Sequence, residues 1–123
     1  MIKMTSKPIS PTQHALLDYA LVGSLLILPT VLNLSPTVKK VYTTEAWVLL
    51  GYVAITDHPL AVKPLIPFQV HGQIDPFNVM GFALQTFLGP FSRSKGATAF
   101  NIGFTLLSGI TVAWTNWKGG YQK

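Results

Sequence analysis

Residues 10–32 read SPTQHALLDYALVGSLLILPTVL and contain one charged side chain, Asp18. A helix needs about 20 mostly apolar residues to cross the hydrocarbon core of a bilayer. The apolar part of this segment nearly reaches that length, so it predicts a transmembrane helix. Ser10 as N-cap, Pro11 at the first helical position and Gln13 at the third complete a capping box, which predicts where the helix begins.

The composition of the whole chain also favours a membrane environment. The 123 residues are 49% hydrophobic and only 11% charged, whereas a soluble domain carries roughly 25% charged residues. The length suits one domain, residues 1–123.

The net charge is +5, but the Lys and Arg residues are scattered at the edges of apolar segments, so nucleic-acid binding is excluded. The absence of cysteine excludes disulfides, thiolate catalysis and zinc-finger chemistry.

Three further segments are candidates for membrane spans: about 41–55, from 68 or 74 to 90, and about 97–117. A start near residue 74 would use Asp75 as N-cap and Pro76 as the first helical residue. Residues 33–44 and 91–96 are predicted to be loops. The apolar connection between the second and third spans contains three prolines, Pro59, Pro64 and Pro67, which exclude a regular helix there.

The two halves of the chain resemble each other. His14 precedes Asp18 by four residues, and His71 precedes Asp75 by four residues. The ends of the second and fourth spans, Thr56-Asp57 and Thr115-Asn116, also correspond. Repeat one covers about 10–58 and repeat two about 67–117, which predicts four transmembrane helices arranged as two tandem helical hairpins.

This topology predicts where the polar residues gather. Two copies of a two-span unit have the same orientation and are related by a pseudo-two-fold axis along the membrane normal. The scarce titratable residues would then form a polar cluster at one membrane face: His14, Asp18, Asp57, His58, His71, Asp75 and Asn116.

A family resemblance rests on particular motifs. His14-x-x-x-Asp18-Tyr19, Thr56-Asp57-x-Pro59-Leu60 and the stretch from Leu65-Ile66-Pro67-Phe68 to His71-Gly72 resemble the small bacterial membrane proteins with SPW repeats. The resemblance covers about residues 10–117, although the Ser-Pro-Trp triad itself is absent. It implies four spans in two tandem hairpins and a bacterial inner membrane, but no activity.

Three interpretations of the polar cluster compete. In the first, the His/Asp pairs cap the helix starts and hold the bundle together. In the second, His14 and His71 ligate a haem or a chlorophyll-type pigment. In the third, the cluster conducts protons or ions. We favour the first interpretation, and we therefore expect no cofactor, no metal site and no catalytic residues.

The function expected from the sequence is an accessory or scaffold subunit of a larger membrane complex, not an enzyme. The alternative is a small proton- or ion-handling transporter, or a cofactor-binding bundle. The expected partners are the lipid bilayer and other membrane subunits or a second copy of the chain. The distribution of Lys and Arg slightly favours cytoplasmic N- and C-termini.

Overall fold

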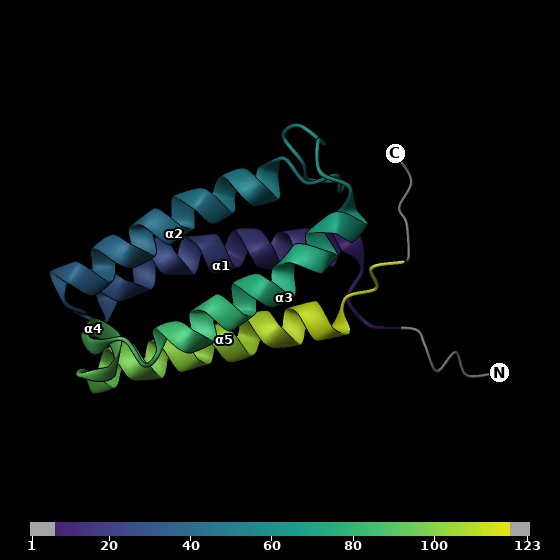
Figure 1. The fold of residues 1–123 in the computed structure, drawn as a ribbon. Helices are drawn as coiled ribbons and strands as arrows, with labels where there is room; N and C mark the ends of the chain where they lie inside the picture. The colour runs from purple at the N-terminus through teal and green to yellow at the C-terminus, as the bar shows by residue number, and fades with distance from the viewer. Residues whose placement is uncertain (1–6, 119–123) are drawn as a thin grey trace.

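A computed structural model describes residues 7–118, and within them the chain is helical without a strand (Figure 1). The helices are α1 (Pro11–Val31), α2 (Pro36–Ala54), α3 (Phe68–Gln85), the single-turn α4 (Gly89–Ser92) and α5 (Lys95–Trp114). α1 packs mainly against α2, and α3 mainly against α5, so two helical hairpins lie side by side. The prediction of an all-helical fold is confirmed.

The starts of α1 and α2 use the same sequence signal. Ser10 accepts a hydrogen bond from the Gln13 backbone, and the Gln13 side chain completes the predicted capping box. At the start of α2, Ser35 accepts a hydrogen bond from the Val38 backbone and Pro36 is the first helical residue, without a capping box. The prediction of a loop over 33–44 is therefore correct only for residues 33–35 and wrong from Pro36 onward. The turn between the two helices is short because Asn33 adopts a left-handed conformation with φ 56.

The third helix begins at Phe68, and Pro76 lies inside it. The alternative start, with Asp75 as N-cap, is wrong, since Asp75 lies inside the helix. The earlier start adds two turns, which place His71 and Asp75 in one continuous helix. The predicted loop over 91–96 is also partly wrong, because α4 covers the beginning of it.

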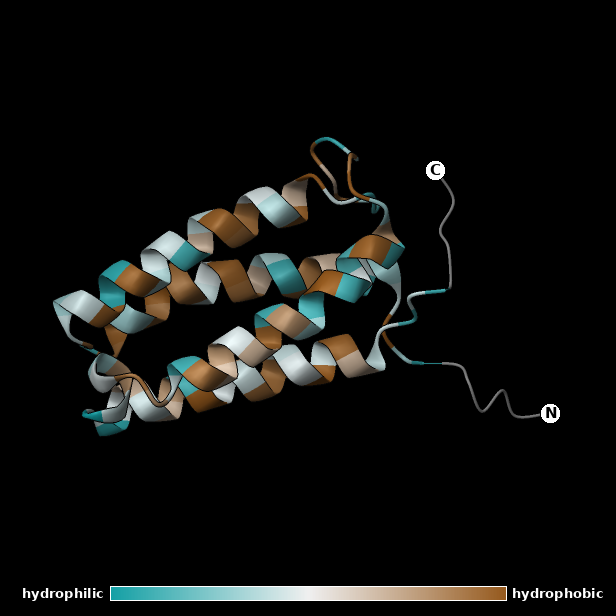
Figure 2. Cartoon of the chain, in the orientation of Figure 1, coloured by the Kyte–Doolittle hydropathy of each residue, from teal (hydrophilic) through white to brown (hydrophobic). Residues whose placement is uncertain are grey.

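The outer faces of the bundle are apolar. Hydrophobic residues occur along all four long helices (Figure 2), and many of the large ones are exposed, among them Leu16, Val48, Leu84 and Leu106. Exposed apolar area on this scale marks a surface that contacts lipid or protein. By length and composition, α1 and α5 are the two described helices able to cross a membrane.

Candidate functional site

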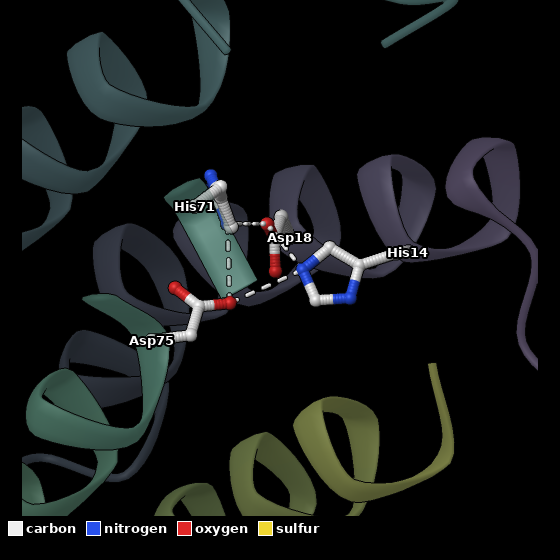
Figure 3. A group of neighbouring side chains, drawn as sticks. All are labelled: His14, Asp18, His71 and Asp75. Atoms are coloured by element: carbon white, nitrogen blue, oxygen red, sulfur yellow. Dashed lines mark ion pairs between the residues drawn. The ribbon is translucent and has the colours of Figure 1, made fainter. Parts of the chain in front are cut away.

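Four side chains meet between the two hairpins. His14 and Asp18 come from α1, and His71 and Asp75 come from α3 (Figure 3). The His14 Nε2 atom lies 3.0 Å from Asp18 Oδ2 and 3.3 Å from Asp75 Oδ2. The His71 Nε2 atom lies 3.2 Å and 3.1 Å from the same two oxygens. Each histidine therefore contacts both aspartates, and we call these four residues the His/Asp quartet.

The quartet is shielded from solvent. Both histidines are 1% exposed, Asp75 is 7% exposed and Asp18 is half-buried. Within residues 7–118, no Lys or Arg forms an ion pair with either carboxylate. Buried carboxylates are costly unless they are paired, protonated or bound to a cation, and the two histidines are the partners that the described residues supply.

Two threonines orient the histidine rings. Thr115 Oγ1 lies 2.7 Å from His14 Nδ1, and Thr56 Oγ1 lies 2.7 Å from His71 Nδ1. Each threonine follows the end of a helix, and its hydroxyl already donates its proton to a carbonyl four residues earlier in that helix, that of Thr111 or Tyr52. The hydroxyl must then accept the hydrogen of Nδ1. This leaves Nε2 of a neutral imidazole with a free lone pair, and Nε2 is the atom that faces the carboxylates.

Within residues 7–118, neither Nε2 atom has the alignment of a hydrogen bond to a single oxygen, although each forms ion pairs with two carboxylates. Both atoms are buried. Each Nε2 is directed between the two oxygens rather than at either one, a geometry that suits a proton shared between the oxygens as well as a bound cation. All four ligand atoms lie within 4.8 Å of one another. The arrangement thus presents two nitrogens and two oxygens to one common point.

Further residues line the quartet. The Tyr52 ring stacks on His71 with ring centroids 4.1 Å apart, and its hydroxyl lies 3.0 Å from Asp75 Oδ1. Asn78 Nδ2 approaches the same oxygen at 3.5 Å. On the other side, the Trp117 ring packs against His14 with centroids 4.7 Å apart. These aromatic rings exclude water and fix the positions of the histidines.

Three residues of the predicted polar cluster lie outside the quartet. Asp57, His58 and Asn116 follow the ends of α2 and α5, at the same end of the bundle. His58 Nδ1 accepts the Leu60 N–H, and Nε2 donates to the Val53 carbonyl. Burial lowers the pKa of His58, which matches this neutral tautomer. The backbone N–H of Asn116 bonds to Ile9 and that of Asp57 bonds to Ile66.

The predicted capping role of the His/Asp pairs is wrong. Ser10 caps α1, and neither α1 nor α3 has an acidic residue in its first turn. The carboxylates instead bind histidines of both hairpins. The orienting roles of Thr56 and Thr115 were not predicted from the sequence. The two threonines occupy equivalent positions in the two repeats, and this correspondence could have indicated a shared role.

No family model, curated protein or solved structure matches the chain. The class defined by the fold and the site is a helical bundle with a buried His₂Asp₂ quartet at the junction of two hairpins. The resemblance to proteins with SPW repeats stays a prediction from the motifs.

Proposed function

We propose that this protein is a four-span integral membrane protein that binds one divalent first-row transition-metal ion at the His/Asp quartet. The observation that carries the proposal is the pair of buried Nε2 atoms, neither aligned with a single oxygen and each facing both carboxylates. Metal-binding histidines commonly donate their other ring N–H to an oxygen acceptor, which fixes the tautomer. Thr56 and Thr115 supply that acceptor here.

The spacing of the ligand atoms suits such an ion. The His–Asp distances of 3.0–3.3 Å form a closed ring. If the ring were square, its centre would lie about 2.2 Å from each atom, at the long end of the 2.0–2.2 Å of Zn–N and Zn–O bonds. The separations among the four atoms reach 4.8 Å, so the ring has to contract by a few tenths of an ångström to bind zinc. Two carboxylates also balance a 2+ charge, which lowers the cost of burying the ion. We assign the site a binding role rather than a catalytic one.

The membrane location rests on the apolar outer faces. α1 and α5 have the length and hydropathy of transmembrane helices, and α2 and α3 pack along them as the other member of each hairpin. A bilayer that surrounds the bundle therefore covers all four helices. The same faces suit lipid and a partner subunit equally, so the accessory-subunit function stays a prediction.

The principal competing state contains no metal. Two protonated histidines and two carboxylates would also be neutral, and the quartet would then serve only to join the hairpins. The haem and pigment alternatives receive less support, because the carboxylates of Asp18 and Asp75 occupy the space between the two Nε2 atoms.

Metal titration of the detergent-solubilised, tag-free protein tests the proposal. After chelator treatment, calorimetry with Zn²⁺ should give one equivalent per chain, and Co²⁺ should give d–d absorption bands. Asp75→Asn and His71→Gln should abolish both signals. His58→Gln, a histidine outside the quartet, should retain them. A folded wild-type protein that binds neither ion, or an Asp18→Asn/Asp75→Asn double variant that still binds, would overturn the proposal.

A further inference from the structure

A second buried polar group lies towards the other end of the bundle. Asn101, on α5, is fully buried and accepts hydrogen bonds from the Tyr42 hydroxyl at 2.7 Å and from Gln85 at 3.0 Å. Its amide nitrogen donates to Thr86 and to the Phe82 carbonyl. Gln85 also donates to Glu45 Oε1 at 3.3 Å. This network connects α2, α3 and α5.

Glu45 is the unusual member of this network. Its carboxylate is half-buried, and within residues 7–118 no Lys, Arg or His lies within ion-pair distance of it. An acidic residue inside a membrane span is costly and marks an ion or substrate pathway more often than a structural contact. Glu45 lines an open groove between α2 and α3, together with Asn78 and Phe82.

This groove adjoins a cavity at the His/Asp quartet. The polar residues that line the cavity include Asp18, Asp75, Asn78, Ser108 and Thr111, and most of the remaining lining is apolar. About 50 Å³ of it is open to the centres of water-sized molecules, and a single water needs only about 10–15 Å³ on this measure. A few waters therefore fit beside the carboxylates. The cavity and the groove share Leu49, Asn78 and Phe82 as walls.

The register of α3 aligns the polar positions. Asp75, Asn78, Phe82 and Gln85 are separated by three, four and three residues, so they share one helix face. This face runs from the quartet to the network at Glu45. Its one apolar member, Phe82, packs against Phe104 with ring centroids 4.7 Å apart. Leu49 and these two phenylalanines therefore separate two polar compartments.

We infer that Glu45 is a second cation station and that a divalent metal ion passes between Glu45 and the quartet along α3. Leu49, Phe82 and Phe104 form the gate, since an apolar constriction blocks ions until it opens and wets. The amide of Asn78 and the waters of the cavity replace part of the hydration shell of the ion on the quartet side. This inference rests on the proposed metal site and extends it from binding to transport.

Zn²⁺ uptake into liposomes that contain the full chain and a trapped zinc-sensitive dye tests the inference. Wild-type protein should accelerate uptake at least tenfold over empty liposomes, and Glu45→Gln should remove most of this increase. Zn²⁺ binding by Glu45→Gln in detergent should stay within threefold of the wild type, because Glu45 is not a quartet ligand. Asp57→Asn, which removes a carboxylate outside the route, should transport normally. A zinc ionophore added last shows that the dye responds.

The outcomes separate the two proposals. Wild-type protein that binds Zn²⁺ but does not accelerate uptake overturns the transport route and leaves the metal site intact. Equal uptake by Glu45→Gln and the wild type removes Glu45 from the route and overturns the inference. Wild-type protein that binds no Zn²⁺ in detergent overturns the metal site, and the transport inference with it.

Discussion

His14 Nδ1 lies 2.7 Å from Thr115 Oγ1 although 101 positions separate the two residues. The equivalent contact in the other direction joins His71 to Thr56. The histidine of each hairpin is thus oriented by a threonine of the other hairpin. Two isolated β-bridges, Ile9 with Thr115 and Thr56 with Ile66, also connect the backbones of the two hairpins. Ligand orientation and association of the hairpins are consequently coupled.

The threonine hydroxyls should control metal affinity. Thr115→Val removes the acceptor of His14 Nδ1, which leaves a buried N–H unpaired at a cost of about 1–3 kcal/mol. Loss of such an orienting contact typically lowers metal affinity by about 10–100-fold. Calorimetric Zn²⁺ titration should show this decrease for Thr115→Val and near-normal affinity for Thr115→Ser.

Thr105→Val is the matched control, since within residues 7–118 the Thr105 hydroxyl bonds only to the Asn101 carbonyl of its own helix. Its affinity for Zn²⁺ should equal that of the wild type. Unchanged affinity in Thr115→Val would show that the threonine does not orient a metal ligand.

Metal removal should destabilise the bundle. An ion bound only by the folded state, at 100 times its dissociation constant, adds about 2.7 kcal/mol to the free energy of unfolding. Thermal unfolding in detergent should therefore shift to lower temperature after chelation and recover when Zn²⁺ is returned. The unfolding temperature of the Asp18→Asn variant should be the same with and without Zn²⁺. An equal Zn²⁺-dependent shift in that variant would place the ion elsewhere.

Local signals in the sequence predicted the secondary structure where a helix start had a strong cap. The capping box at Ser10 and Gln13 lies where the sequence placed it. The same Ser-Pro signal begins α2 at Ser35-Pro36, but the charges of Lys39 and Lys40 are equally typical of a loop. Hydropathy does not distinguish charged residues in a loop from charged residues in the first turns of a helix.

The site was only partly predictable. The repeated His-x-x-x-Asp spacing identified all four members of the quartet, but not that each histidine would contact both aspartates. That contact depends on how two hairpins pack, which the spacing within one helix does not encode. Asp57 and His58 were grouped with the quartet on topology alone. Their neighbours in the loop determine their positions instead.

Gly72 should tolerate no side chain. A Cβ atom at this position would lie 2.6 Å from Cδ2 of Trp117, whose ring is held between Phe68 and His14. Because the ring has little freedom to move, Gly72→Ala should lower the free energy of unfolding by about 1–3 kcal/mol. Chemical denaturation in detergent measures this change.

Gly103→Ala provides the control, because nothing lies within 4 Å of a Cβ at that helical position. It should be neutral or stabilising by up to about 1 kcal/mol. If the two variants were equally stable, the Trp117 ring would not be packed tightly against α3.

Labelling of single cysteines should distinguish four spans from two, since the natural chain has no cysteine. Val62 lies in the exposed connection between α2 and α3, and Arg93 lies between α4 and α5. With four spans, Val62→Cys and Arg93→Cys lie on opposite faces of the membrane. If only α1 and α5 crossed, both cysteines would lie on the same face.

A membrane-impermeant maleimide should therefore label one of them in intact cells and the other in inverted vesicles, and both in detergent. With cytoplasmic termini, Val62→Cys is the one that reacts in inverted vesicles, because an even number of spans separates it from the N-terminus. Labelling of both cysteines from one side would contradict the four-span topology.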